Sequence, residues 1–269
     1  MALLIAVVGC QSTTVTPTSR SAPTPAFTPI VTSIASTATP AVAGSWQAVG
    51  KGVEFQQLSR NVNGVDDWVS VVRIDLTQAK LQVRYSPDDP RGVRAWQLAS
   101  EADAVINAGF FNEQKQATGL VIADAKRFGQ TYRGFGGMFS VRAGKPQLQW
   151  LASKPYVQDQ QITQAVQSFP MLLVNGQVVN GIPDNGERNR RSFVGIDRQG
   201  RVVLGVCQSP VWTMTDLARY LATDKGLNLR DALNLDGGAS TGLWVRGISE
   251  PLLLNSVEAV PAVITVNGR

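Results

Sequence analysis

The 269-residue sequence contains no histidine and only two cysteines, and these absences limit its chemistry. Without histidine, the protein cannot contain a Ser-His-Asp triad, a Cys-His pair or a histidine-ligated zinc site. Two cysteines cannot build a disulfide framework or a cysteine-rich metal site. Any catalysis must therefore depend on carboxylates, arginine, lysine, tyrosine, hydroxyls, backbone amides or a hard metal ion.

Charged residues are also sparse, at 17% of the chain, and the formal net charge is only +5. This charge is spread along the sequence, so it permits an anionic substrate without requiring nucleic acid, and we expect no nucleic-acid partner. The chain is 43% hydrophobic and contains 25 glycines and 14 prolines. Such a composition is typical of a globular protein and excludes a wholly disordered or fibrous chain.

The first ten residues, MALLIAVVGC, are apolar up to Cys10. Because a helix needs about 20 apolar residues to span a bilayer, this stretch is too short to do so. Small residues before a cysteine at the end of an apolar run are typical of a secretory signal segment, and this one resembles the lipobox of bacterial lipoproteins. The alternative is a chance apolar N-terminus. We expect an exported bacterial lipoprotein, anchored through lipid on Cys10 to a membrane and facing the periplasm or the cell exterior.

Residues 11–44 are dominated by Ser, Thr, Pro and Ala and carry a single charge, Arg20. Such a segment cannot bury enough apolar surface to offset the entropy lost on ordering, so we expect an extended tether. Residues 45–269 are then one globular domain. The remaining cysteine, Cys207, lies in an apolar run and is expected to be a buried, inert strand residue. A nucleophilic role for it has little support, because no histidine can activate it.

Short apolar runs separated by frequent turn signals predict the fold of this domain. Asn175-Gly176 and the segment 197–200 indicate two hairpins. Helices are predicted at 93–100 and at 214–223, the second with Thr213 as its N-cap. Further strands are predicted at 69–76, 81–85, 104–107, 120–123, 138–141, 232–235, 243–245 and 260–266. We therefore expect a single α+β domain with a mostly antiparallel or mixed sheet and a few packed helices.

Three segments carry residues suited to chemistry. In the first, an apolar strand leads to Asp236, which is followed by Gly237, Gly238 and Ser240. Glycines let a backbone approach a ligand closely, and a carboxylate at a strand end is a common general base. From local chemistry alone, a structural turn in which Asp236 caps its own backbone explains the segment slightly better.

The second segment, from Ile106 to Asn112, contains Asn107, Gly109 and Phe110, which are suited to orienting a sugar hydroxyl and lining a pocket. Taken alone, a strand-ending turn with its phenylalanines in the core explains this segment better. The third segment has three arginines in four residues, at 188, 190 and 191, before Ser192. Guanidinium groups match phosphate oxygens, although such runs are usually solvated loops. Because Arg191 enters an apolar strand, it is the arginine expected to point into a site.

Taken in order, these segments resemble the phosphodiester glycosidase family. The family's pattern of Ile-Asn-(Gly/Ala)-Gly-Phe-Phe, an Arg-Thr pair opening a late strand, a helix, and Asn-Leu-Asp-Gly-Gly-Gly-Ser corresponds here to residues 106–111, 191–192, 214–223 and 234–240. Ser192 replaces the threonine, and Ala239 replaces the third glycine. That second replacement is tolerated only if residue 239 does not need a positive φ angle.

The resemblance implies an envelope-anchored hydrolase that cleaves the glycosidic C–O bond of sugar-1-phosphodiesters. Asp236 and Arg191 would be the catalytic residues. The predicted substrate-binding residues are Asn107, Gly109, Phe110, Ser192, Gly237, Gly238 and Ser240. The partner would be a phosphorylated carbohydrate, and bacterial relatives suggest an association with exopolysaccharide.

No cofactor is required by the sequence, and a Ca²⁺ or Mg²⁺ ion stays open because no ligand-loop spacing indicates one. One alternative is a non-catalytic cell-surface protein that binds anionic glycans or exopolysaccharide in the same pocket. Another is a phosphodiesterase that cleaves the P–O bond.

Overall fold

The computed structural model describes residues 44–247 and 250–268 of the chain. The predicted signal segment 1–10, the lipidation site Cys10 and all but the last residue of the tether 11–44 lie outside the described residues. The described residues belong to one compact unit, Ala38–Arg269. The domain boundaries drawn from the sequence stay predictions.

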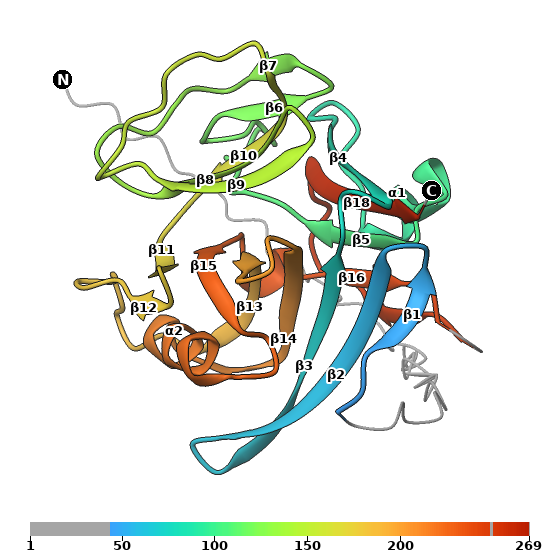
Figure 1. The fold of residues 1–269 in the computed structure, drawn as a ribbon, viewed down its shortest axis with the longest axis vertical. Helices are drawn as coiled ribbons and strands as arrows, with labels where there is room; N and C mark the ends of the chain where they lie inside the picture. The colour runs from blue at the N-terminus through green and yellow to red at the C-terminus, as the bar shows by residue number, and fades with distance from the viewer. Residues whose placement is uncertain (1–43, 248–249, 269) are drawn as a thin grey trace, which may run out of the picture. The chain divides into compact units, whose positions relative to one another are not determined.

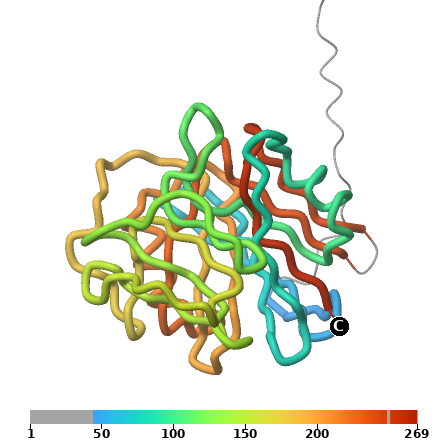
Figure 2. The backbone as a smooth tube through the Cα atoms, turned by 90° about the horizontal axis from the view of Figure 1, so that it is seen from above, coloured from blue at the N-terminus to red at the C-terminus, as the bar shows by residue number. Residues whose placement is uncertain are grey.

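The described residues form three sheets in which every paired strand is antiparallel (Figure 1). The largest has the order β1 (Gln47–Gly50), β2 (Val53–Val62), β3 (Val65–Ile74), β14 (Val202–Trp212), β13 (Asn189–Asp197), β15 (Leu229–Asn234), β11 (Met171–Val174), β12 (Gln177–Val178). The second has the order β7 (Lys126–Phe128), β6 (Val121–Ala123), β10 (Ile162–Ser168), β8 (Gly137–Arg142), β9 (Lys145–Trp150). The third has the order β17 (Leu252–Leu254), β16 (Leu243–Val245), β5 (Ala104–Asn107), β18 (Ala262–Gly268), β4 (Ala79–Tyr85). Figure 2 shows the red strand β18 beside β4, far from it in sequence.

The inner faces of the three sheets pack against one another in the largest apolar core. Leu204 from the first sheet, Phe139 from the second and Ile264 from the third are all fully buried there. The other face of the first sheet is covered by α2 (Met214–Thr223), which buries Leu217 and Leu221. Because the first sheet is covered on both sides, its central strands are apolar on both faces, as in buried sheets generally.

Cys207 lies in this second apolar core and is fully buried, as predicted. Burial raises the pKa of its thiol well above the ordinary value, so the thiolate that a nucleophile needs is not accessible.

Both predicted helices are confirmed with their bounds, α1 (Val93–Ser100) and α2. Thr213 forms a reciprocal capping box with Asp216, in which each side chain accepts a hydrogen bond from the backbone N–H of the other. Neither helix in the described part of the chain has the length and apolar character needed to cross a membrane.

The predicted α+β class is correct only in its antiparallel sheets and few helices. The described part of the chain has eighteen strands and two α-helices of eight and ten residues, so the fold is dominated by β-structure. The prediction gave both helices correctly but underestimated the share of β-structure, because it missed strands rich in polar residues. β10 is one example, since its glutamines Gln164 and Gln167 are buried in the sheet.

Candidate active site

Asp236 follows β15, a central strand of the first sheet, where the chain leaves the core. Leu233 and Leu235 are fully buried, whereas Asp236 is only partly buried. After it the chain turns into a single 3₁₀ turn at Gly238–Ser240. The strand therefore delivers the carboxylate from a rigid support to the surface of the core.

Glycine is required at each of the two positions after Asp236, but for different structural reasons. A Cβ atom at Gly237 would lie 2.9 Å from the carbonyl oxygen of Arg190, so only glycine allows this close approach. Gly238 has a φ of +58°, in the left-handed region that favours glycine. Ala239 is not among the residues with positive φ, so its replacement of the third glycine causes no backbone strain.

The three segments identified in the sequence meet at Asn107. Its Nδ2 donates to the carbonyl oxygen of Asp236 at 2.7 Å, and its Oδ1 accepts from Ser192 Oγ at 2.8 Å and from the N–H of Gly242 at 3.2 Å. The N–H of Asp236 donates to the carbonyl oxygen of Ala108 at 3.0 Å. These bonds hold the backbone of Asp236 on both sides.

Asn107 and Ser192 are fully buried, and neither lines a cavity beside Asp236. The structure therefore places them as positioning residues under the Asp236 turn, not in the substrate-contacting place that the sequence suggested. Gly109 is also buried, and a Cβ atom there would lie 2.7 Å from the carbonyl oxygen of Gln167. It permits close packing of the Phe110 segment against the end of β10.

Asp236 lies between two cavities. The larger, of about 590 Å³, also contains Phe110, Arg191, Gly237 and Gly238. The smaller, of about 340 Å³, shares Phe110, Asp236 and Gly237 with it and adds Ser240, Asn112, Glu113 and Glu258. The structure thus brings six of the nine predicted catalytic and substrate-binding residues to these two cavities, namely Phe110, Arg191, Asp236, Gly237, Gly238 and Ser240.

Burial raises the pKa of Asp236 from 3.8 to about 6. Hydrogen bonding from the Ser240 side chain and the Gly237 backbone opposes this rise, the charge of Glu258 adds to it, and the charge of Lys115 opposes it. A carboxyl group with a pKa near 6 exchanges protons readily close to neutral pH. Raised values of this kind are common at catalytic carboxylates.

Arg191 is the arginine of the basic run that lines the larger cavity, as the sequence suggested. Its Nε donates to the carbonyl oxygen of Trp212 at 3.0 Å and its Nη2 to that of Glu187 at 2.7 Å. Within the described part of the chain, Nη1 has no acceptor. Two backbone carbonyls therefore fix the guanidinium plane and leave Nη1 for a ligand.

The other two arginines of the run donate hydrogen bonds to backbone carbonyl oxygens of the protein. Arg190 does not line the larger cavity and donates to the carbonyl oxygens of Thr241 and Asn255. Arg188 donates from an exposed position to the carbonyl oxygen of Val211 at 3.5 Å.

Two carboxylates that the sequence did not identify also line the larger cavity. Burial opposes ionisation of Asp184, but hydrogen bonds from Thr215 and the N–H of Gly186 lower its pKa to about 2. Glu187 accepts hydrogen bonds from Asn185 and Asn189, which lower its pKa. The turn signals at 183–187 marked this loop, but no sequence pattern indicated that it would face the cavity.

Aromatic rings form one wall of the larger cavity. Phe110 stacks on Phe169, with ring centroids 4.4 Å apart, and both line the cavity. Tyr132 and Phe135 pack edge-on against Phe169, each with a centroid separation of 5.9 Å. Phe169 and Phe135 remain 36% and 48% exposed, which leaves apolar ring surface for a ligand. The sequence indicated Phe110 and marked the glycine-rich segment that contains Phe135, but gave no sign of Tyr132 or Phe169.

The sequence left a Ca²⁺ or Mg²⁺ ion open. In residues 44–247 and 250–268, no group of three or more Cys, Asp or Glu side chains is placed to hold a metal ion.

The structure resembles three solved structures at low sequence identity. The catalytic domain of zebrafish N-acetylglucosamine-1-phosphodiester α-N-acetylglucosaminidase, auto-inhibited by its pro-peptide, matches with a TM-score of 0.61 and 19% identity over 84% of this chain and 88% of that one. A hypothetical protein from Synechocystis matches with a TM-score of 0.58 and 17% identity over 81% of this chain and 62% of that one. A protein described as exported, from Burkholderia pseudomallei, matches with a TM-score of 0.54 and 12% identity over 75% and 74%. These likenesses show a shared fold.

No curated protein matches the chain. This chain spans 62% of the length of the Synechocystis protein. The family model for phosphodiester glycosidases matches residues 100–267, which is more than half of the sequence and contains every segment of the Asp236 site. The chain therefore belongs to the phosphodiester glycosidase family.

Proposed function

We propose that this protein hydrolyses the glycosidic C–O bond of sugar-1-phosphodiesters, with Asp236 as its catalytic carboxylate and Arg191 as its phosphate ligand. The observation that carries the proposal is the position of Asp236. It is a partly buried acid with a pKa raised to about 6, and it lies between two cavities, one of which contains Arg191.

The chemistry explains why one carboxylate and one arginine are enough. Most glycosidases use two carboxyl groups, because an alkoxide leaving group needs a proton. A phosphodiester leaves as a phosphate monoester, which is already stable as an anion. It needs its charge stabilised more than it needs a proton, and the Nη1 of Arg191 supplies that stabilisation.

Asp236 then acts on the sugar. At neutral pH a carboxyl group with a pKa of about 6 is mostly ionised, so it can activate a water molecule or stabilise an oxocarbenium-like centre. The hydrogen bonds from Asn107 and to Ala108 fix its backbone, so little reorganisation is needed when the anomeric carbon becomes positive.

The two cavities suggest how the substrate lies. The phosphate would occupy the larger cavity beside Arg191, and its alcohol portion would continue along the ring of Phe169. The sugar would occupy the smaller cavity, where Ser240, Asn112 and Glu113 offer polar groups to its hydroxyls. The anomeric carbon would then lie at Asp236, where the cavities join.

The test is a screen of the purified protein against sugar-1-phosphodiesters, with Asp236→Asn compared with the wild type. We expect Asp236→Asn to lower kcat by about a thousandfold or more and to keep substrate affinity within about tenfold. The exposed carboxylate variant Asp88→Asn is the matched control and should keep full activity.

The stability of the Asp236→Asn variant shows whether a loss of activity comes from unfolding or from loss of the catalytic group. Because burial raises the pKa of Asp236 from 3.8 to about 6, its ionised form destabilises the fold by roughly 3 kcal/mol at pH 7, an effect that grows as pH rises from about 4 to 6. Asp236→Asn should therefore be at least as stable as the wild type.

If the wild type binds these compounds but releases no sugar, the protein is a binding protein and not an enzyme.

We also propose that the protein is exported and held at a membrane by lipid on Cys10. The support is the sequence of residues 7–10, Val-Val-Gly-Cys, together with the polar tether that follows. One structural relative is described as exported. Mass spectrometry of the mature N-terminus should show a diacylglyceryl-modified Cys10 in a bacterial host, and Cys10→Ala should release the protein from the membrane fraction. An unmodified N-terminus at Met1 would contradict the proposal.

A further inference from the structure

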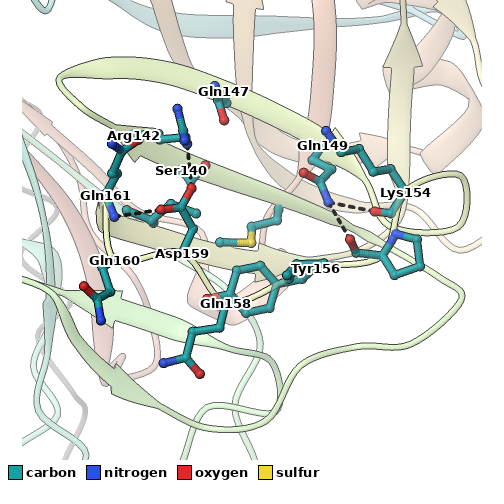
Figure 3. A pocket seen from close by; sticks show the side chains of 14 residues that line it. Ser140, Arg142, Gln147, Gln149, Lys154, Tyr156, Gln158, Asp159, Gln160 and Gln161 are labelled. Carbon is teal, nitrogen blue, oxygen red and sulfur yellow. Dashed lines mark hydrogen bonds and ion pairs between the residues drawn. The ribbon is translucent and has the colours of Figure 1, made fainter.

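A cavity larger than the one at Asp236 lies on the second sheet, and its volume is about 770 Å³ (Figure 3). Gln160, Gln161 and Ile162 line it at the start of β10. Phe169 and Pro170, which follow the other end of β10, line the Asp236 cavity. The cavity also reaches Met138, which pairs with Gln167 near that end of β10, but no residue lines both cavities. The larger one is therefore a separate place on the protein.

The alternation of β8 and β9 creates its floor. Phe139 and Leu148 face the main core, so the neighbours Ser140, Gln147 and Gln149 face the other way. Ser140 is paired with Gln147 across the two strands, and both line the cavity. Residues 154–161 return beside this face and form the opposite wall.

Glutamine is the main lining residue, and Gln147, Gln149, Gln158, Gln160 and Gln161 all contribute. Gln149 Nε2 donates to the carbonyl oxygens of Lys154 and Pro155, at 2.7 and 3.1 Å, which fixes the opposite wall. The side chains of the other four have no hydrogen-bond partner within residues 44–247 and 250–268. Four amide groups, each able to donate and accept, are therefore available to a ligand.

The charges of the cavity nearly cancel. Arg142 Nε and Asp159 Oδ2 form an ion pair at 2.6 Å, and Asp159 Oδ1 also accepts from the N–H of Gln161. Lys154 is the remaining charged side chain of the lining, and no carboxylate in the described chain pairs with it. A single lysine is a weak attraction for phosphate groups or nucleic acid, so the lining favours a neutral ligand rich in hydroxyls.

Tyr156 adds an aromatic ring to these amides (Figure 3). Its hydroxyl is buried and has no partner in the part of the chain that the structure describes. The Arg127 guanidinium lies 5.5 Å from the ring centroid and helps to hold it. A ring next to several amides suits a sugar, because the apolar C–H face of a sugar packs on the ring and its hydroxyls pair with the amides.

We propose that this groove, defined by Ser140, Gln147, Gln149, Tyr156 and Gln161, binds a neutral oligosaccharide chain. Its volume lies within the range of about 300–1,000 Å³ that is common for ligand pockets. The groove would hold a glycan on residues that do not line the Asp236 cavities, independently of cleavage. It is a binding site in its own right and does not depend on the catalytic proposal.

The experiment measures binding of cellotetraose, maltotetraose and tetra-N-acetylchitotetraose to the full chain, by calorimetry and ligand-observed NMR, with dextran sulfate as a charged comparison. We expect at least one neutral tetrasaccharide to bind with a Kd of about 1 mM or tighter. The double variant Gln147→Ala, Gln161→Ala removes two exposed amides and should weaken that binding at least tenfold. Gln177→Ala, an exposed glutamine elsewhere, should leave it unchanged.

Hydrolysis of a small sugar-1-phosphodiester separates the two proposals, because the double variant should leave its rate unchanged, while Asp236→Asn should leave tetrasaccharide binding unchanged. The groove proposal is overturned if no neutral tetrasaccharide binds, if dextran sulfate alone binds, or if the double variant binds the tetrasaccharide as well as the wild type does.

Discussion

The Asp236 site and the glutamine-lined groove share no lining residue and hold their polar groups in different ways. At the Asp236 site, Asn107 and Ser192 are fully buried and bonded within the protein, and they fix the backbone that carries the carboxylate. In the groove, Gln147 and Gln161 are exposed and their side chains have no bond within the described chain. At the Asp236 site the buried side chains fix the carboxylate that we propose as catalytic, whereas in the groove the amides stay free to pair with the proposed ligand.

We expect the largest effect from removing Asn107, which holds the backbone of the Asp236 site. Asn107→Ala removes three hydrogen bonds and leaves buried groups of Asp236, Ser192 and Gly242 unpaired. We expect a loss of about 4 kcal/mol in the free energy of unfolding, measured by urea denaturation. Asn180→Ala, at an exposed position, should change it by about 0.5 kcal/mol or less. Equal effects of the two variants would show that Asn107 does not organise the site.

Arg191→Ala tests the arginine that lines the larger cavity together with Asp236. Removing one group that stabilises a developing anion typically lowers kcat by about a hundredfold, and we expect a similar loss here. Arg188→Ala is the matched control, because Arg188 is exposed and does not line the cavity. Steady-state kinetics on a sugar-1-phosphodiester would measure both. If the loss with Arg191→Ala appears in KM alone, Arg191 binds the substrate without stabilising the transition state.

The pH dependence of hydrolysis tests the raised pKa of Asp236. If the ionised carboxylate is the active form, kcat/KM should fall about tenfold per pH unit below pH 6, because protonation at a pKa of about 6 removes it. Binding of tetrasaccharide in the groove should not change over the same range, because Asp159 is held ionised by Arg142 and the glutamines do not titrate. If kcat/KM instead begins to fall only near pH 4, burial does not raise the pKa of Asp236.

The smallest effect concerns the aromatic wall. Phe169→Ala removes the ring that stacks on Phe110 and should raise KM by about threefold to tenfold with little change in kcat, since the ring contacts the part of the substrate that does not react. Phe135→Ala, further along the cluster, should have a smaller effect. A large fall in kcat with Phe169→Ala would instead place this ring at the reacting carbon.

The sequence predicted the apolar elements well because their signals are local. The helix Met214–Thr223 has its cap, Thr213, beside it, and Asn175-Gly176 joins β11 to β12 as the hairpin signal indicated. The strand β10 was missed, because its buried glutamines satisfy distant backbone groups. Gln164 Oε1 accepts from the N–H of Val83, a bond between residues 81 positions apart. No local pattern contains such a partner.

The candidate site shows the same limit. The motifs placed Asp236 and Arg191 correctly on one cavity, since each motif combines a strand end with a polar side chain. They did not show that Asn107 would turn inward, because its partners come from distant segments of the chain. Phe169 and Asp184 reach the cavity only through the arrangement of β10, β13 and α2.

The most direct test of the account is the position of the cleaved bond. Hydrolysis of a sugar-1-phosphodiester by the wild-type protein in ¹⁸O-labelled water, followed by mass spectrometry of both products, shows which atom the water attacks. The account predicts that the label enters the sugar, at its anomeric carbon, and that Asp236→Asn abolishes this incorporation. Label in the phosphate would show P–O cleavage and contradict the roles given to Asp236 and Arg191.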